Sequence, residues 1–344
     1  MHGLHEPTNP AVDGPALTVL LYVPGSRYDT VRGTINSLRV QTARAGLEVL
    51  LLAPDASVVP LDDVAVREFC RVRVIHVGEL GSRAQAMAEG VRQASAALVA
   101  FAGNHSYPEP DWATRLIDAH AGSWAAVAPS ELNANPATTI SWAHFLIGHG
   151  RWIFPVDGGE TDAVPMTNGA FKRTLLLEYG EHLEQALERD GTLAQDLRRR
   201  GHRLLLESDA RVHHFNISRL LSFVRFRVWV GRAYAASRAR RERWNAARRL
   251  VYAIGWPLIP VVQLKALARS TRRCLTVYGL MPRVIPALLL GLTAHAVGEA
   301  IGYLFGMGSA RREILRFESN LGAHMSADDQ ARRDAWLRLG GQSA

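Results

Sequence analysis

The stretch ALVAFAGNHSYPEPDW, residues 97–112, carries the clearest indication of the fold. Its first six residues are all apolar, as expected of a buried strand, and the run ends at the polar triplet Gly103-Asn104-His105. Two prolines bracket the turn that follows, and a helix is predicted to begin at Trp112. A strand that ends in a polar turn and leads into a helix predicts one edge of an α/β sheet.

On the N-terminal side the same arrangement repeats. Apolar runs alternate with segments whose apolar residues share one helical face, which predicts helices at 30–41 and 82–94. This alternation is typical of βαβ units and predicts a mostly parallel central sheet flanked by helices on both faces. The apolar runs, predicted to be buried strands, are residues 17–23, 48–52 and 72–77.

Ligands of such sheets bind at the carboxyl ends of the strands. These ends are Pro24-Gly25, Asp55 and the triplet at 103–105. Further along, the pattern predicts a strand at 124–129, an amphipathic helix at 183–200 that stops at Gly201, and a strand at 204–207.

The charge of the chain is unevenly distributed. The net charge is +8, yet residues 216–283 contain 15 Lys and Arg residues and one acid, Glu242, a local charge of +14 that leaves −6 for the rest. A strongly basic segment indicates an anionic partner, although a solvated arginine-rich helix face has the same composition. Nucleic acid is disfavoured, because the arginines alternate with long apolar runs rather than with aromatic and polar side chains.

Two apolar segments accompany the basic region. Residues 250–262 are too few to cross a hydrocarbon core of roughly 30 Å. Residues 284–307 are numerous enough, but they include the ionisable residues His295 and Glu299 at i, i+4 spacing. A re-entrant or interfacial hairpin at an anionic membrane surface is therefore expected, with burial in a helical subdomain as the alternative.

These patterns divide the chain into four parts. Residues 1–16 are polar and rich in proline and glycine, which predicts a flexible lead-in rather than a signal peptide. An α/β domain is expected at 17–216, a basic and apolar helical region that associates with a membrane at 217–307, and a charged soluble tail at 308–344. The two cysteines, Cys70 and Cys274, lie far apart and outside any metal-ligand spacing, which favours a reducing compartment.

Together, residues 17–216 resemble the family 2 glycosyltransferases, inverting enzymes of the GT-A fold. The resemblance implies a nucleotide-sugar donor, with Pro24 and Gly25 in the nucleotide pocket and Asp55 at the base or ribose. Arg83 matches a position that faces the nucleotide, and Asn168, in TNGAFKR, matches a loop on the side of the donor sugar and the acceptor.

The same resemblance assigns the chemistry. The segment ERDGTLAQDLRRRG, residues 188–201, aligns Asp190 with the general base, and DARVHH, residues 209–214, aligns His214 with a histidine that contacts the metal or diphosphate. The triplet 103–105 occupies the place of the acidic metal motif, so Asn104 would face the donor and His105 would be a ligand. Here two of the expected acids are missing.

That substitution leaves the cofactor open. Mn²⁺ and Mg²⁺ favour carboxylate oxygens, and Asn104 offers only a carbonyl, so a divalent metal would depend on His105 and His214 or be replaced by cations such as Arg83. The sequence predicts an inverting transferase at the cytoplasmic face of the cell membrane, acting on a glycan or lipid-linked acceptor. A domain that binds a nucleotide-sugar or glycan without turnover is the alternative.

Overall fold

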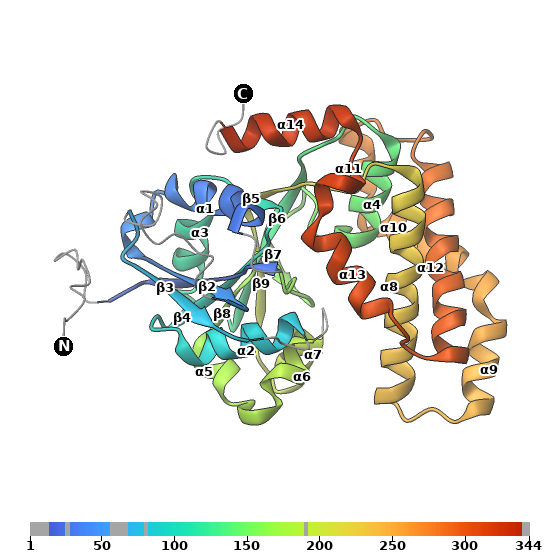
Figure 1. The fold of residues 1–344 in the computed structure, drawn as a ribbon, viewed down its shortest axis with the longest axis horizontal. Helices are drawn as coiled ribbons and strands as arrows, with labels where there is room; N and C mark the ends of the chain where they lie inside the picture. The colour runs from blue at the N-terminus through green and yellow to red at the C-terminus, as the bar shows by residue number, and fades with distance from the viewer. Residues whose placement is uncertain (1–13, 25–27, 56–67, 79–81, 189–191, 339–344) are drawn as a thin grey trace. The chain divides into compact units, whose positions relative to one another are not determined.

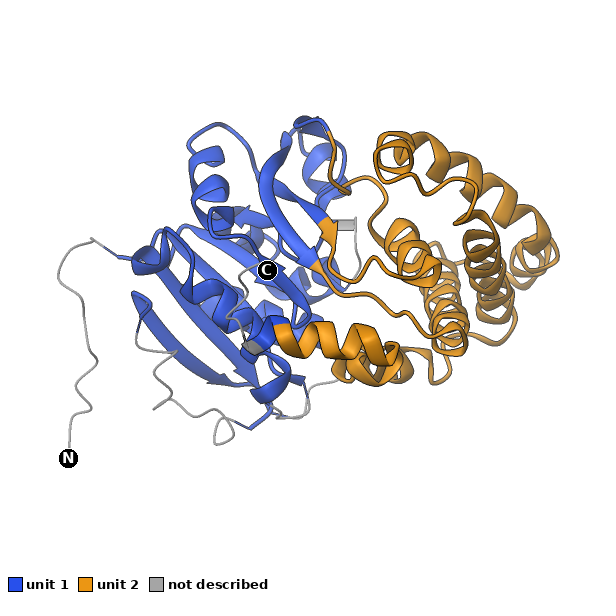
Figure 2. Ribbon diagram, turned by 90° about the horizontal axis from the view of Figure 1, so that it is seen from above, with its two compact units in different colours: residues 1–131, 157–213, 336–344 blue, residues 132–156, 214–335 orange. Residues whose placement is uncertain are grey.

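The computed structural model describes residues 14–24, 28–55, 68–78, 82–188 and 192–338. The chain divides into two compact units, which Figure 2 colours separately. Unit 1 comprises residues 1–131, 157–213 and 336–344, and unit 2 comprises residues 132–156 and 214–335.

Unit 1 is built on one sheet. Its described strands follow the order β3-β2-β1-β4-β8-β6-β9-β5, and β7 pairs with β9. Helices cover both faces of this sheet, with α1 and α3 on one side and α2, α5, α6 and α7 on the other (Figure 1). The strands are β1 (Leu17–Tyr22), β2 (Leu47–Ala53), β3 (Arg71–His76), β4 (Leu98–Ala102), β5 (Ser106–Pro108), β6 (Ala126–Asn133), β7 (Gly159–Thr161), β8 (Ala170–Lys172) and β9 (Leu204–His214).

The sheet is mixed. β1 is parallel to both β2 and β4, and β2 is parallel to β3, whereas β8 is antiparallel to both β4 and β6. Val19 lies opposite Val49 and Ala100, and all three are at most 1% exposed, because helices cover both faces of these central strands. The predicted α/β class is confirmed, and the four predicted N-terminal strands begin and end within one residue of their expected positions.

The helices of unit 1 follow the expected pattern with one exception. The predicted helix at 183–200 is wrong as a single element, since α6 and α7 are separate helices, and residues 189–191 between them lie outside the described residues. The predicted stop at Gly201 is confirmed: φ is +86° there, and His202 N donates to Leu197 O at 3.0 Å. The helices are α1 (Arg32–Arg39), α2 (Arg83–Gln93), α3 (Trp112–Ala119), α5 (Arg173–Leu177), α6 (Leu183–Leu187) and α7 (Thr192–Arg199).

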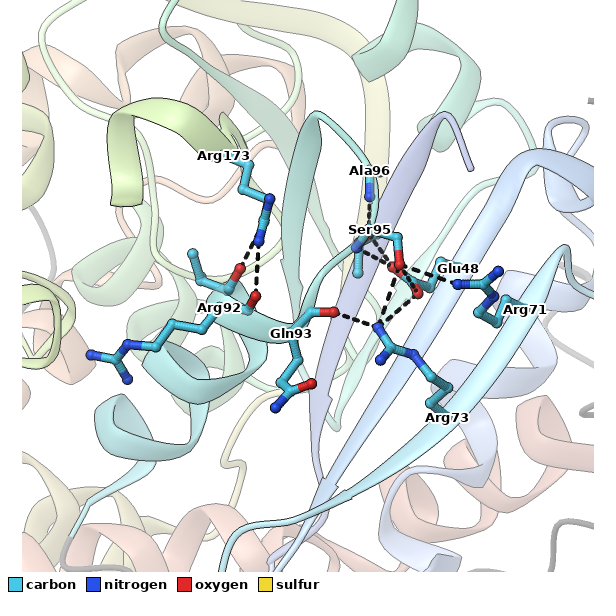
Figure 3. A network of polar contacts seen from close by, with 10 residues as sticks. Glu48, Arg71, Arg73, Arg92, Gln93, Ser95, Ala96 and Arg173 are labelled. Carbon is cyan, nitrogen blue, oxygen red and sulfur yellow. Dashed lines mark hydrogen bonds and ion pairs between the residues drawn. The ribbon is translucent and has the colours of Figure 1, made fainter. Parts of the chain in front are cut away.

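A buried carboxylate lies near the start of β2. Glu48 is fully buried and accepts hydrogen bonds from Thr18 Oγ1 at 2.6 Å, from Ser95 N at 2.7 Å and from Arg73 Nη2 at 3.0 Å (Figure 3). Burial by itself would raise the pKa of Glu48, but these hydrogen bonds and the Arg73 charge outweigh it and lower that pKa. Glu48 therefore ties β1, β3 and the loop before β4 to β2, at the sheet edge opposite the strands' carboxyl ends.

Unit 2 is helical in its described part. It contains α4 from the middle of the chain and a series of helices from the C-terminal third, which confirms the predicted helical C-terminal region. The helices are α4 (Thr139–His149), α8 (Leu220–Arg241), α9 (Ala246–Ile254), α10 (Ile259–Ser270), α11 (Arg272–Val277), α12 (Ile285–Phe305), α13 (Ala310–Ser319) and α14 (Ala327–Arg338), and the one-turn helix η7 (Trp256–Leu258) joins α9 to α10.

The apolar segment 284–307 forms one continuous helix, α12, and the expected hairpin is wrong. Its ionisable pair is buried in unit 2: His295 Nδ1 lies 3.2 Å from Arg227 Nη2 of α8, and its Nε2 lies 3.3 Å from Glu299 Oε1. Because Arg227 and the two α12 side chains satisfy one another, the helix needs no break at these residues.

Glycines bring α8 and α12 into close contact. A Cβ atom built on Gly231 of α8 would overlap the carbonyl oxygen of His295, and one built on Gly298 or Gly302 of α12 would overlap a carbonyl of α8. Small residues allow two helix backbones to approach this closely.

Among the described residues, α12 is the one single helix that is long and apolar enough to cross a membrane, yet 56% of its apolar window is buried inside the protein.

We expect Gly298→Ala to destabilise the protein by about 1–3 kcal/mol, because the new methyl group must push α8 away from α12. Gly148→Ala is the matched control, since nothing lies within 4 Å of a Cβ built at this exposed position in α4. The control should be neutral or stabilise by up to about 1 kcal/mol, because alanine is the better helix former. Urea unfolding measures both, and equal effects would refute the close-packing argument.

Candidate functional site

The carboxyl ends of the central strands lie at one edge of the sheet in unit 1. Val23 N donates to Leu52 O at 2.9 Å, so the residues after β1 and β2 are neighbours. Pro24 is buried there and Asp55 is exposed, whereas Gly25 lies outside the described residues. The sequence thus placed Pro24 and Asp55 at the same edge correctly, because parallel strands end on the same side.

Arg83 and Tyr22 both lie at this edge of the sheet. Arg83 is the first residue of α2, whose N-cap Ser82 accepts a hydrogen bond from Gln85 N at 3.2 Å. Burial raises the pKa of Tyr22, the last residue of β1, and the nearby Arg83 charge partly opposes that rise. A cation at a helix N-terminus is suited to binding an anion. Tyr22 was not predicted as a site residue, although it is the one aromatic side chain of β1.

The polar triplet after β4 is packed tightly. Thr34 Oγ1 donates to Gly103 O at 2.8 Å. A Cβ built on Gly103 would lie 2.7 Å from Ser106 Oγ and 2.9 Å from Thr167 Cγ2. An acidic side chain at position 103 therefore needs its neighbours to move. The side chains of Ser106 and Thr167 occupy the space into which a side chain at position 103 would extend.

Asn168 holds this triplet in place. It is 1% exposed, has a φ of +65°, and its Oδ1 accepts a hydrogen bond from Gly103 N at 3.3 Å. Trp112 Nε1 donates to the backbone carbonyl oxygen of Asn168 at 3.2 Å, and the backbone N–H of Asn168 donates to Phe101 O. Asparagine tolerates positive φ better than most residues. The structure thus brings Asn168 next to the triplet, 65 residues away in sequence.

Two buried polar atoms beside this turn have no hydrogen-bond partner within the described part of the chain. They are Asn168 Nδ2 and Ser106 Oγ, and both residues are at most 1% exposed. Buried polar atoms in proteins nearly always have partners, and those that lack one often belong to functional sites. Asn168 and Ser106 therefore mark this turn as part of the candidate site.

The metal-binding prediction depends on two histidines in different units. His105 Nδ1 lies 2.7 Å from Asn104 Oδ1 in unit 1, and His214 Nδ1 lies 3.0 Å from Asn216 Oδ1 in unit 2. No group of three or more His, Cys, Asp or Glu side chains suited to a metal occurs among the described residues. An amide and an imidazole at the triplet fit Mg²⁺ poorly, because Mg²⁺ binds carboxylates and water. The ligand roles of His105 and His214 remain predictions.

The neighbour of His214 has a structural partner. His213 Nε2 lies 2.9 Å from Glu109 Oε1, and this hydrogen bond is the main reason why the pKa of Glu109 is lowered. The Trp336 ring lies 4.8 Å from the His213 ring, so His213 also contacts the end of α14, whose residues from 336 onward belong to unit 1. His213 is thus engaged within unit 1.

The predicted base, Asp190, lies outside the described residues. The preceding helix, α6, lies beside α2, and Ser82 Oγ donates to Glu184 Oε1 at 3.2 Å. The chain segment that leads to Asp190 thus starts next to the helix that begins with Arg83.

Comparison with known proteins agrees with this geometry. The family model "Glycosyl transferase family 2" matches residues 26–176. Comparison with curated proteins by sequence found no match. Among solved structures, the mannosyltransferase PcManGT from Pyrobaculum calidifontis, in complex with GDP-Man and Mn²⁺, superposes with a TM-score of 0.56 at 16% identity, over 87% of this chain and 91% of that one.

A second solved structure is more distant. GalNAc-T7 with UDP, GalNAc and Mn²⁺ gives a TM-score of 0.43 at 12% identity, over 59% of this chain and 44% of that one. The likeness to the mannosyltransferase confirms the GT-A fold expected from the sequence.

Proposed function

The chain carries a glycosyl transferase family 2 domain at residues 26–176, and on this premise we propose that it transfers a sugar, with inversion, from a nucleotide-sugar to a membrane-linked or cell-envelope glycan acceptor. The observation that supports donor binding most directly is the position of Arg83, the first residue of α2. This cation lies at the sheet edge where ligands of such folds bind.

The proposed chemistry is a single displacement. An acceptor hydroxyl oxygen forms a bond to the anomeric carbon while the bond to the diphosphate oxygen breaks, and the electron pair leaves with the diphosphate. Asp190 takes the hydroxyl proton as general base. Negative charge grows on the leaving diphosphate, and fixed cations stabilise such charge in the transition state. Arg83 is the described residue that we assign to this role.

The fold comparison suggests which donor to test first. The mannosyltransferase of similar fold binds GDP-Man with Mn²⁺, so GDP-mannose is the first donor to test, with UDP-sugars next. The triplet 103–105 offers a divalent ion few suitable ligands, and no catalytic step is assigned to one here.

We expect calorimetric titration of the full-length protein to show binding of one nucleoside diphosphate and its sugar conjugate. Arg83→Ala should weaken this binding about tenfold or more, because a charge-assisted hydrogen bond to the diphosphate is lost. Arg92→Ala is the matched control, since Arg92 is an exposed arginine at the other end of α2. Equal affinities for the two variants would refute the role of Arg83.

The same titration, repeated with Mn²⁺ and with Mg²⁺, tests the predicted metal ligands. If His105 and His214 hold a divalent ion, affinity for the nucleotide should rise on adding the ion, and His105→Ala should abolish that rise. Affinity that is independent of metal in the wild type would refute this ligand pair and leave the diphosphate to cationic side chains.

A second candidate function follows from the packing at Gly103. A domain that binds a nucleotide-sugar or glycan without turnover has no need of an acid at position 103, where a side chain would displace Ser106 and Thr167. Donor binding combined with no product from any acceptor, and no donor hydrolysis, would favour this reading.

We place the acceptor at the cytoplasmic face of the cell membrane. The support is the composition of residues 216–307, which combine a high positive charge with two apolar segments.

A further inference from the structure

A continuous row of large aliphatic side chains is exposed on unit 2. It follows one face of α9, crosses the one-turn helix η7 and continues along α10. We call it the apolar outer face; its members are 51–70% exposed, and they are Leu250, Val251, Ile254, Leu258, Val261 and Val262. Ile254 follows Leu250 and Val251 by four and three residues, and Leu258 follows Ile254 by four. Val261 and Val262 follow Leu258 by three and four residues, as expected for one side of a helical path.

The opposite side of this path packs within unit 2. Ala253 and Pro260 are buried, and Gln263 Nε2 donates to Glu299 Oε1 of α12 at 3.5 Å. The two helices are therefore fixed by their inner side, and the apolar outer face is left without cover. Soluble proteins rarely expose contiguous apolar patches of this kind unless another surface covers them.

Basic residues continue the same face. Lys265 and Arg269 are exposed on α10, one and two turns beyond the apolar row, and Arg248 is exposed just before it. Residues 243–298 contain eight Lys and Arg residues and no Asp or Glu. Arg248 is paired with Glu242 at 3.7 Å, so the covering surface must accept aliphatic side chains in its centre and positive charge mainly at the α10 end.

These two requirements select among possible occupants. A second copy of this chain would bring like charges together, which is unfavourable. Nucleic acid would satisfy the arginines but not the leucine, isoleucine and valine side chains. An anionic lipid bilayer meets both requirements, because acyl chains take up aliphatic groups and headgroup phosphates attract Lys and Arg.

We propose that α9, η7 and α10 form a monotopic membrane anchor that inserts the apolar outer face into an anionic bilayer. Neither α9 nor the segment 256–270 is long enough to cross a membrane by itself, and only the two together reach the required length. The chain bends by 46° at their junction. The bend and the one-sided exposure fit a helical pair that lies in the interface. This inference rests on the proposed function, because the bilayer that the anchor binds is the surface on which the proposed acceptor would lie.

Vesicle sedimentation of the full-length protein tests the anchor. The vesicles are phosphatidylcholine alone or an equal mixture of phosphatidylcholine and phosphatidylglycerol. We expect the variant I254S/L258S to bind both at least about tenfold more weakly than the wild type, because two large side chains no longer enter the acyl region. The matched control, L220S/L221S, removes two exposed leucines at the start of α8 and should bind as the wild type does.

Charge reversal tests the basic flank separately. K265E/R269E should lose about tenfold in binding to the anionic vesicles, since each basic residue near such a surface contributes to attraction. R44E/R115E makes the same charge change at exposed positions of unit 1 and should have little effect. Binding by the wild type should also weaken as salt is raised.

Each result has a definite meaning. Failure of the wild type to sediment with anionic vesicles, or sedimentation of I254S/L258S equal to that of the wild type, would overturn the anchor. The circular dichroism spectrum of each variant should match that of the wild type, which would exclude misfolding. Nucleotide binding by the same variants, measured by titration, should also match the wild type. If vesicle binding holds while nucleotide binding and turnover fail, only the proposed function falls.

Discussion

Replacing Asp190 by asparagine is expected to lower the rate of sugar transfer by about 100- to 10,000-fold, the usual contribution of a general base. Asparagine has nearly the same size as aspartate, but its amide cannot take up the proton of the attacking acceptor hydroxyl. Donor affinity should be unchanged, because the proposed role of Asp190 begins only when the acceptor attacks. A fall in kcat without a change in donor affinity is therefore the diagnostic result.

Glu188→Gln is the matched control, because Glu188 is an exposed acid two residues before Asp190. Its turnover should stay near that of the wild type. Transfer by Asp190→Asn at the wild-type rate would show that the base lies elsewhere. A loss in Glu188→Gln alone would instead shift the assignment to Glu188.

Removal of the buried carboxylate in unit 1 is expected to have the largest effect on stability. Glu48→Ala should cost about 3–5 kcal/mol, because it leaves Arg73, Thr18 and the Ser95 N–H without their common acceptor. Urea unfolding at neutral pH measures the loss. The control is Glu89→Ala, which removes an exposed carboxylate paired with Arg92 and should change stability by less than about 1 kcal/mol.

The pH dependence gives an independent check. Because folding lowers the pKa of Glu48, its contribution is fully present above the pKa of an unfolded glutamate, about 4.3. It is lost as the pH falls through the lower, folded pKa. The stability difference between wild type and Glu48→Ala should therefore shrink on acidification below about pH 4. A difference that is constant across this range would mean that the charge of Glu48 contributes nothing.

Local patterns were sufficient for the elements of unit 1 up to β4. An uninterrupted apolar run such as residues 17–23 has few alternatives to a buried strand when a turn follows it. The glycine stop at Gly201 is equally local, since positive φ favours glycine at the end of a helix. The same short-range signals, in order along the chain, were enough to identify the family and the GT-A fold.

Local patterns failed where partners come from distant parts of the chain. The periodicity of residues 183–200 suits one helix or two, and the sequence alone did not separate α6 from α7. His295 and Glu299 suggested a break, because Arg227, 68 residues before His295, was not yet known to face them. Glu48 is an acid in an otherwise apolar strand, and its partners Thr18, Arg73 and Ser95 come from distant parts of the sequence that a local pattern does not connect.

The candidate site shows the same division. The resemblance to the family selected Arg83, Asn104, His105 and Asn168 as site residues, and their roles stay predictions. The sequence did not reveal that Asn168 binds Gly103, or that Ser106 and Thr167 occupy the space beside Gly103. The pattern of apolar and polar residues specifies each strand or helix, whereas contacts across 60 or more residues arise only when those elements pack, since packing alone selects which side chains meet.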